Sequence, residues 1–398
     1  MTSTQAPQAA RPVHDRPTLV AFSTIGIWSW FVYGFGASLA LLRDDQGTTP
    51  WLGGLHATAL AAGGILGALA TPRLNHRFGR GAVMRVSVLA TAVSIVWFLL
   101  PGTPVGSTLT AIFVTCFFGN IVVVCVNSFI ATHQGTASPA AFTESTALAA
   151  LTGLLAPLGV GLAAGSVLGW RFGLLAAAVA FGLLELWRGR RVSVYGIKEE
   201  TLVREESGPL PALTWWALGA GMCYIGAEFC LSLWGVDLLR ERAGLSPAAA
   251  AAGLSTITGG VFVGRVLGVR LAERMSTERL LRASLILGLI TFLLAWAIPS
   301  TWVVLTAMFL TGVSLALAWP LNLSRIIRSA HGSTDRAAAL TLATATTAIG
   351  GAPFILGAVS EAVGVHLAFL VVPVLLIASF VIVSLRPVAD EPAERASA

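Results

Sequence analysis

Hydrophobic residues in this chain are gathered into runs of about twenty, and short segments rich in arginine, glycine and proline separate the runs. A helix of about 20 residues crosses the roughly 30 Å hydrocarbon core of a bilayer. The pattern therefore predicts an all-α membrane protein with twelve transmembrane helices. The predicted spans are 18–42, 51–70, 83–100, 108–131, 140–165, 170–187, 211–239, 247–268, 280–298, 301–322, 337–358 and 365–385.

One long polar segment interrupts this pattern midway and carries glutamates beside arginines. We interpret it as a linker between two six-helix bundles. The expected organisation is an N-terminal tail at 1–17, bundles at 18–187 and 211–385, the linker at 188–210 and a C-terminal tail at 386–398.

Composition agrees with a lipid environment. Charged residues make up only 11% of the chain, hydrophobic residues make up 56%, and the mean hydropathy is +0.81. A soluble domain needs about 25% charged residues to cover its surface, so the composition excludes a soluble globular protein. The net charge of +6 comes from arginines between apolar runs, which indicates membrane topology and not nucleic-acid binding.

The sequence offers no pattern for catalysis, cofactor or metal binding. The only lysine, Lys198, lies outside any glycine-rich phosphate loop, which excludes transport driven by ATP hydrolysis in this chain. Cys116, Cys125, Cys223 and Cys230 lie in apolar segments without metal-type clustering with histidine, so we assign them packing roles. No nucleophile and base are spaced as in an enzyme, and we expect neither enzymatic activity nor a cofactor.

The basic residues predict the orientation of the spans. With a cytoplasmic N-terminus, 21 of them fall in inside segments, and only Arg43, Arg171, Arg240 and Arg242 fall outside. This is the positive-inside distribution, so we expect both termini in the cytoplasm. The excess of arginine over lysine and the abundance of alanine are typical of a GC-rich bacterial genome, and a bacterial inner membrane is the expected location.

An internal repeat relates the two halves at an offset of about 196 residues. Such a steady offset over several helices is hard to obtain by chance. The aligned pairs are Asn127 with Asn322, Ala156-Pro157 with Ala352-Pro353, His76-Arg77 with Glu273-Arg274, and Gly169-Trp170-Arg171 with Gly364-Val365-His366.

Two parallel six-helix repeats in a chain of this length resemble the major facilitator superfamily, whose substrate site lies between the halves near the membrane midplane. The segment Arg77-Phe78-Gly79-Arg80 resembles the Asp-Arg-x-Gly-Arg loop of that family, although His76 replaces the Asp and Pro72 replaces the upstream Gly. The resemblance implies a gating role for this loop. The implied gating residues are Arg77, Gly79, Arg80 and the repeat-related Arg274.

Two branches of the superfamily share further motifs with the chain. Tyr224-Ile225-Gly226-Ala227-Glu228, Trp234, Gly264-Arg265 and Asn127 resemble the fucose-permease-like branch. That resemblance implies proton-coupled uptake of sugars or similar solutes, but the first span lacks the acid of the fucose transporters, so sugar specificity is not carried over. The segment 153–161, Gly-Leu-Leu-Ala-Pro-Leu-Gly-Val-Gly, is similar to the signature of drug/proton antiporters, with Ala156 in place of a Gly. It implies efflux instead.

Glu228 is the acid that lies deepest in a predicted span. It sits about 24 Å along a helix that begins near Pro211, close to the midplane. An ionised carboxylate there costs at least ~2.5–3.5 kcal/mol, so Glu228 should face a cavity and be protonated for part of the time, as proton coupling requires. The alternative is a neutral Glu228 that hydrogen-bonds a neighbouring helix. Glu144 is a second candidate for proton coupling, with pairing to loop groups or cytoplasmic arginines as its alternative.

Repeat-related positions also predict a substrate cavity. Glu228 is equivalent to Val32 and Tyr224 to Trp28, so these positions should face one central axis, and residues three or four away share their helix faces. Buried asparagines need partners, which substrate or neighbouring helices could supply, and a tryptophan could instead anchor at the lipid interface. The predicted substrate-binding residues are Trp28, Ser29, Val32, Asn120, Asn127, Tyr224, Glu228, Ser232 and Asn322.

Together these features predict a monomeric secondary transporter that works by alternating access. Aromatic walls with a few hydroxyl groups suit a small neutral or amphipathic solute, and Glu228 suits coupling to protons. The expected partners are this solute, protons and the bilayer. An efflux antiporter for drugs or metabolites, and a membrane sensor or scaffold that transports nothing, are the alternatives.

Small residues and prolines predict how the helices pack. The segments Gly63-x3-Gly67 and Gly260-x3-Gly264-x3-Gly268 should let helix backbones approach closely. Pro157, Pro320 and Pro353 should kink their helices, because proline removes a backbone hydrogen bond.

Overall fold

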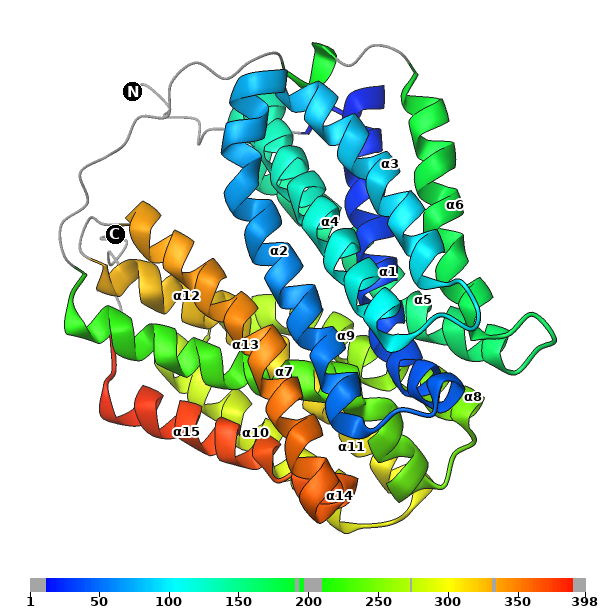
Figure 1. Ribbon diagram of the computed structural model, residues 1–398. Coiled ribbons are helices and arrows are strands. Elements are labelled where there is room, and N and C mark those ends of the chain that lie inside the picture. The colour runs from blue at the N-terminus through cyan, green and yellow to red at the C-terminus, as the bar shows by residue number, and fades with distance from the viewer. Residues whose placement is uncertain (1–11, 190–192, 197–209, 273, 331–333, 389–398) are drawn as a thin grey trace, which may run out of the picture.

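This computed structural model describes residues 12–189, 193–196, 210–272, 274–330 and 334–388. All the regular secondary structure of these residues is helical. The first bundle consists of α1 (Arg16–Gln46), α2 (Pro50–Phe78), α3 (Arg80–Phe98), α4 (Val105–Gln134), α5 (Ser138–Ala164) and α6 (Trp170–Arg188), with the short 3-10 helices η1 (Gly135–Ala137) and η2 (Ser193–Tyr195). The second consists of α7 (Ala212–Ala243), α8 (Pro247–Gly253), α9 (Ser255–Ala272), α10 (Thr277–Ala297), α11 (Thr301–Leu315), α12 (Ala318–Ser329), α13 (Thr334–Val363), α14 (Val365–Ala368) and α15 (Val371–Leu385). Figure 1 shows the two bundles side by side.

These helices make twelve crossings, which confirms the predicted all-α membrane fold. The eighth crossing is α8 with α9, the tenth is α11 with α12, and the twelfth is α14 with α15. Pro320 and Pro373 stand at the third residue of α12 and α15, where each removes a hydrogen bond to the preceding turn. The tenth and twelfth crossings are therefore interrupted at these turns, whereas α5 and α13 continue through Pro157 and Pro353.

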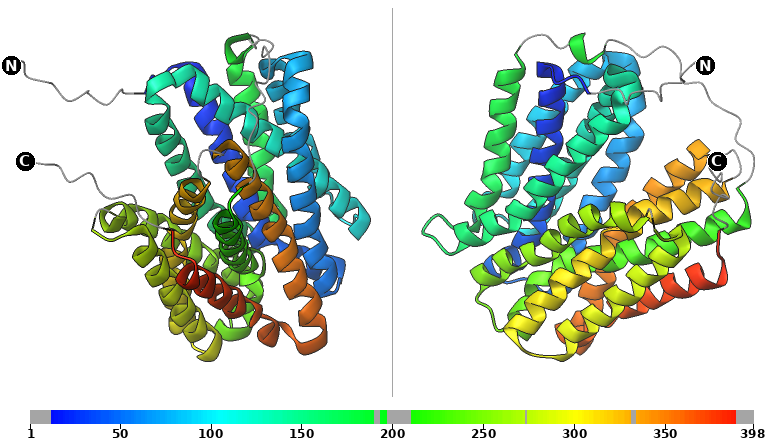
Figure 2. Two further views of the ribbon diagram at one scale, coloured as in Figure 1. Left: turned by 90° about the vertical axis from the view of Figure 1, so that its left-hand side faces the viewer. Right: turned by 180° about the vertical axis from the view of Figure 1, so that it is seen from behind.

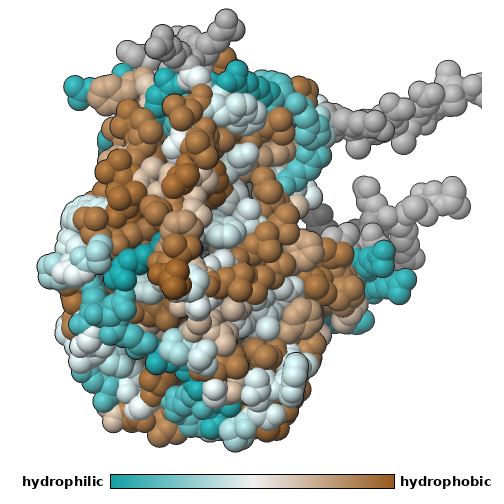
Figure 3. Space-filling model, turned by 90° about the vertical axis from the view of Figure 1, so that its right-hand side faces the viewer, coloured by the Kyte–Doolittle hydropathy of each residue, from teal (hydrophilic) through white to brown (hydrophobic). Residues whose placement is uncertain are grey.

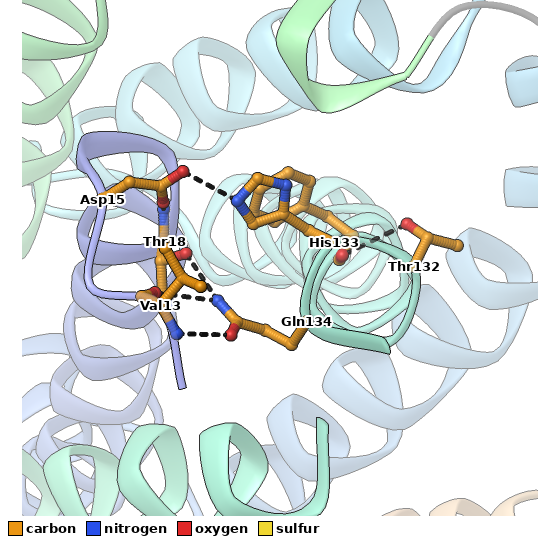
Figure 4. Close-up of polar contacts among 7 residues, drawn as sticks. Val13, Asp15, Thr18, Thr132, His133 and Gln134 are labelled. Atoms are coloured by element: carbon orange, nitrogen blue, oxygen red, sulfur yellow. Dashed lines mark hydrogen bonds and ion pairs between the residues drawn. The ribbon is translucent and has the colours of Figure 1, made fainter. Parts of the chain in front are cut away.

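The segment that precedes the first crossing is better ordered than a free tail. The helix α1 begins at Arg16, two residues before the predicted span, with Asp15 as its N-cap. The Val13 N–H donates to Gln134 Oε1 over 2.8 Å, Gln134 Nε2 donates to the Val13 carbonyl over 2.9 Å, and Asp15 contacts His133 at 2.8 Å (Figure 4). Residues 13–15 thus pack on the end of α4. Most of the predicted tails and linker (1–11, 190–192, 197–209 and 389–398) lies outside the described residues.

Glycine stripes bring neighbouring backbones together, as predicted. A Cβ at Gly63 would lie 2.2 Å from the Phe113 carbonyl oxygen of α4, and one at Gly260 would lie 2.0 Å from the Phe309 carbonyl oxygen of α11. Any side chain here would separate these helices. The same device therefore closes α2 on α4 in the first half and α9 on α11 in the second.

Large apolar side chains cover much of the outward surface. Leu186, Leu162 and Trp302 are 79%, 73% and 80% exposed, and Figure 3 shows broad hydrophobic areas on one side of the molecule. Apolar exposure on this scale marks a surface that contacts lipid.

The two bundles contact each other mainly at one end. We define the inner end of the molecule as the end where α1 begins and α15 terminates, and the outer end as the opposite one; Figure 2 shows both from two sides. The main contacting pairs are α1 with α7, α2 with α13, and α5 with both α8 and α9. A Cβ at Gly36 of α1 would lie 2.4 Å from the Ser232 carbonyl oxygen of α7, so these two helices touch backbone to backbone.

Ion pairs reinforce the contact at the outer end. Arg43 of α1 pairs with Asp237 of α7, and its guanidinium lies 4.4 Å from the centroid of the Trp234 ring. Arg240 of α7 pairs with Asp44 of α1 at 2.7 Å. Among the described residues, every ion pair that joins the two bundles lies at this end, so the bundles are joined there and diverge toward the inner end.

Candidate functional site

Two adjoining cavities lie between the bundles, near the middle of the crossings. The N-side cavity has a volume of about 420 Å³ and is formed mainly by α1, α4 and α5. The C-side cavity has a volume of about 290 Å³ and is formed by α7, α9, α13 and the α11–α12 junction. Arg265 of α9 lines both cavities. The two hollows therefore meet at a guanidinium group.

Half of the residues that line the N-side cavity are polar. Ser29, Tyr33, Asn120, Asn127, Ser145 and Thr146 contribute its hydroxyl and amide groups. The Trp28 ring forms an aromatic wall that rests on α4, since a Cβ at Gly119 would lie 2.1 Å from it. The glycine at position 119 therefore leaves room for the ring.

Internal hydrogen bonds hold two of these polar groups. Ser29 Oγ donates to the Ala149 carbonyl over 2.6 Å, and Asn120 Nδ2 donates to the Cys116 carbonyl over 3.0 Å. Asn127, two turns further along α4, is exposed to the cavity and has no hydrogen bond to a described residue. Asn127 is thus the amide that can bind a solute without losing an internal bond.

The C-side cavity is mostly apolar and contains the deepest acid. Glu228 stands sixteen residues after Ala212 on α7, so it lies about 24 Å along a helix of roughly 46 Å. The rest of the lining is almost entirely apolar, with Ile225, Phe229, Val261, Trp319 and Ile349 among its members. A carboxyl group in these surroundings gains much from a nearby positive charge.

Charge and hydroxyl groups converge where the cavities meet. Glu228 and Arg265 lie within electrostatic range of each other, and the Tyr33 hydroxyl of α1 lies within range of both. Tyr33 comes from the first bundle, and the other two come from the second. The junction therefore joins both bundles through groups that respond to charge.

The structure brings six of the predicted binding residues to these cavities. They are Trp28, Ser29, Val32, Asn120 and Asn127 in the N-side cavity and Glu228 in the C-side cavity. Val32 and Glu228, which the repeat relates, face adjoining hollows instead of the single one that we expected.

The other three predicted binding residues pack between helices. The Tyr224 side chain is 1% exposed, and its hydroxyl has no partner among the described residues. Asn322 is 2% exposed and donates from Nδ2 to the Ala217 carbonyl of α7 over 3.1 Å. Ser232 meets α1 through its backbone. None of the three lines either cavity, because each stands where α7 touches another helix.

Glu144 lies apart from both cavities. It stands in the second turn of α5 near the inner end, where it contacts His14 at 2.6 Å. Its side chain is 42% exposed. The structure thus favours the pairing alternative for Glu144, with a histidine as partner in place of an arginine.

The predicted gating residues occupy the inner surface. Gly79 separates α2 from α3 with φ of 81°, which only glycine adopts easily. Arg80 is 7% exposed, and it donates from Nε to the Tyr195 carbonyl over 2.5 Å and from Nη2 to Thr132 Oγ1 over 3.0 Å. Arg77 lies 5.1 Å from the Phe78 ring centroid, and Arg274 is exposed in the turn after α9. Arg80 therefore ties the loop to η2 and α4 within the first bundle.

Sequence reasoning missed Tyr33 and Arg265 as site residues. We counted Arg265 among the inside arginines because it stands only a few residues from the end of its predicted span. The helix continues to Ala272, about two turns beyond Arg265, so the guanidinium lies inside the crossing. Tyr33 follows Val32 directly, and a strict three-or-four spacing rule passed over it.

A hollow larger than either central cavity is of a different kind. It has a volume of about 560 Å³ and lies among α1, α5 and α6. The described residues of its lining carry no charge and are mostly apolar, such as Ile27, Trp30, Leu183 and Trp187. Ser23 and Thr152 are its hydroxyl residues, and without a charged group to orient a solute it is a weaker candidate than the central pair. Among the described residues, no cluster of His, Cys, Asp and Glu could hold a metal ion.

Comparisons with known proteins agree with this arrangement. The family model of the Major Facilitator Superfamily matches residues 216–398. No curated relative matches the chain in sequence.

Solved structures match nearly the whole chain in fold. A bacterial homologue of the human lysosomal transporter Spinster, in an inward-facing and occupied conformation, is 15% identical with a TM-score of 0.72, over 93% of this chain and 95% of its own. The nucleoside transporter NupG is 11% identical with a TM-score of 0.72, over 94% and 99%. FucP, the fucose:proton symporter of E. coli, is 16% identical in its outward conformation with a TM-score of 0.62, over 94% and 99%.

The chain shares with these solved transporters a fold of two six-span bundles, and its candidate site lies between the bundles. The sequence match to the Major Facilitator Superfamily covers residues 216–398, slightly less than half of the chain, and the fold match to solved transporters covers nearly its full length. Both matches agree with the family resemblance drawn from the sequence.

Proposed function

We propose that the chain is a proton-coupled secondary transporter of a small neutral or amphipathic organic solute, which binds where the N-side and C-side cavities meet. The observation that carries this proposal is the position of Glu228. Its carboxyl group lies midway along α7 and borders a cavity. A group placed there can take up and release a proton, and its charge is costly enough in the membrane interior to bias the conformation.

The contacts between the bundles support alternating access. The bundles are joined at the outer end by the Arg43–Asp237 and Asp44–Arg240 pairs and diverge toward the inner end. Access from the outer side requires that these pairs separate while the inner ends approach. We propose that the inner end is cytoplasmic, in line with the 21 to 4 distribution of basic residues, and that the membrane is a bacterial inner membrane.

The lining of the cavities argues against the alternative of a sensor or scaffold without transport. Such a protein needs no solute site and could fill the space between its bundles with apolar side chains. Here Asn127 and Arg265 face the hollow without internal partners among the described residues, which suits a solute that supplies those partners.

Reconstituted vesicles test the proposal. The purified full chain is placed in proteoliposomes, a pH gradient of either sign is imposed, and accumulation is measured across a panel of radiolabelled sugars, nucleosides, amino acids, carboxylic acids and antibiotics. We expect at least one solute to accumulate against its gradient in the parent. Glu228→Gln should still exchange that solute but should no longer accumulate it.

Glu144→Gln is the matched control, because it removes an acid that pairs with His14 away from the cavities. This variant should accumulate solute as the parent does. If Glu228→Gln concentrates solute as well as the parent, the proposed coupling role is wrong. The sign of the gradient that drives accumulation separates uptake from efflux.

A further inference from the structure

Arg265 is an unpaired positive charge at the centre of the site. Among the described residues that line the two cavities, only Glu228 and Arg265 carry a formal charge. Within the described residues, Arg265 has neither a hydrogen bond nor an ion pair, and it is exposed to the hollow. Its charge and Glu228 interact only at longer range.

Three other arginines that lie within or beside the crossings are paired with carboxylates of the protein. Arg43 is paired with Asp237, Arg188 with Glu185 at 3.1 Å, and Arg325 with Glu278 at 2.6 Å. A buried guanidinium is costly unless an anion satisfies it. Arg265 is the exception, and its exposure to the cavity means that an anion from outside the chain can reach it.

The neighbourhood of Arg265 fits the head of an organic acid. A guanidinium presents a planar fork of donors that matches a carboxylate in a bidentate manner. On one side of Arg265, the N-side cavity offers Tyr33 and Asn127 as further hydrogen-bonding groups. On the other side, the C-side cavity offers an apolar wall that includes Phe229 and Trp319.

We propose that the transported solute is a small organic carboxylate and that Arg265 binds its carboxyl group. This inference rests on the proposed function and narrows its solute class. The aromatic and hydroxyl lining alone suits a neutral or an amphipathic solute, and Arg265 selects an amphipathic one whose polar head is negatively charged.

The same geometry explains why a proton travels with the acid. With the carboxylate bound and Glu228 ionised, two negative charges share one guanidinium, and with Glu228 protonated the site is neutral. Among the described residues, the titratable and charged groups within electrostatic range of Glu228 are Tyr33 of α1, Tyr224 of α7 and Arg265 of α9, and of these only Arg265 carries a charge at neutral pH. Anion and proton therefore bind together, which predicts symport of one carboxylate with one proton.

Matched pairs of ligands test the solute class. Thermal stabilisation of the full-length purified chain is measured with carboxylic acids and their uncharged counterparts: lactate and lactamide, benzoate and benzamide, gluconate and glucose, pyruvate and acetone. We expect at least one acid to raise the melting temperature in a saturable way, while its neutral partner does not. If no acid exceeds its neutral partner, or if neutral ligands stabilise more strongly, the inference is overturned.

Variants of Arg265 then test the residue. Arg265→Gln should weaken binding of the identified acid by about tenfold or more and reduce the preference for acid over amide to about twofold. Arg265→Lys should recover part of that preference. Arg270→Gln removes a charge from the same helix, outside both cavities, and should bind as the parent does. An unchanged preference in Arg265→Gln would refute the assignment.

Transport distinguishes failure of this inference from failure of the proposed function. If a neutral solute accumulates under a pH gradient and Glu228→Gln abolishes its accumulation, the transporter proposal holds and the carboxylate inference fails. If an acid binds through Arg265 but no gradient drives its movement, the binding inference holds and the coupling proposal fails.

Discussion

The ion pair between Arg43 and Asp237 should stabilise the conformation in which the outer end is closed. Arg43 and Asp237 form an ion pair across the bundles, and their side chains are only 9% and 12% exposed. Asp237→Asn leaves the Arg43 guanidinium buried without its counter-charge whenever the outer end is closed. When that end opens, water can solvate Arg43, so the substitution raises the free energy of the closed form selectively.

The burial of the pair sets the size of this increase in free energy. Removal of one partner from a buried ion pair costs roughly 3–5 kcal/mol. We expect the lower value, because both side chains keep slight exposure and Arg43 also lies over the Trp234 ring. A shift of ~3 kcal/mol changes the ratio of the two conformations about 150-fold.

Spin-label distances measure this ratio. Labels at Val167→Cys and Trp302→Cys lie on exposed positions at the outer ends of the first and second bundles. Asp237→Asn should move the distance distribution toward longer separations. The control is Arg240→Gln, which breaks the more exposed pair with Asp44 and should cost less than ~1 kcal/mol. If Asp237→Asn and the parent give the same distribution, the pair does not hold the outer end closed.

Two further predictions concern stability. Gly63→Leu should lower the melting temperature by an amount that corresponds to about 1–3 kcal/mol or more, because its Cβ would lie 2.2 Å from the Phe113 carbonyl oxygen; Gly182→Leu, whose Cβ would meet nothing within 4 Å, should fold normally, and equal melting temperatures would contradict the packing. Asp15→Ala should lose roughly 1 kcal/mol of α1 capping. Partial burial raises the pKa of Asp15, but hydrogen bonds with Thr18 and His133 outweigh this effect and lower the pKa below its ordinary value. The stabilisation by Asp15 is therefore present at neutral pH and is lost as the pH falls through that lowered pKa. Acidification should lower the melting temperature of the parent faster than that of Asp15→Ala. If both melting temperatures fall equally, Asp15 makes no such contribution.

The fold was predictable because lipid imposes one strong rule on each segment. Apolar runs of about twenty residues must become helices that satisfy their own backbone groups, so the twelve crossings and the two bundles follow from the sequence pattern. The structure adds a repeat-related detail that the sequence analysis did not include: Gly47 and Gly244 end α1 and α7 with φ of 59° and 63°. The interruptions at Pro320 and Pro373 depend on how proline acts within each crossing, and the sequence indicated only the first of them.

The site was predictable only in part, because the direction of a side chain depends on how whole helices rotate against each other. Trp28 and Glu228 were placed on a central axis by the repeat, and both line a cavity. Tyr224 lies one helical turn from Glu228, yet it is buried, because α7 packs closely there. Arg265 was hidden by its position near the end of a predicted span, since a few residues of uncertainty in a boundary decide between a loop charge and a cavity charge.

Coupling through Glu228 requires that a proton enters together with the solute, and this proton movement can be measured. Proteoliposomes with a trapped pH-sensitive dye and little internal buffer receive the identified acid, as its membrane-impermeant anion, without an imposed gradient. We expect the interior to acidify by one proton for each solute molecule that enters. In Glu228→Gln this acidification should be abolished, while solute exchange persists. Solute entry with no change in internal pH would contradict coupling through Glu228.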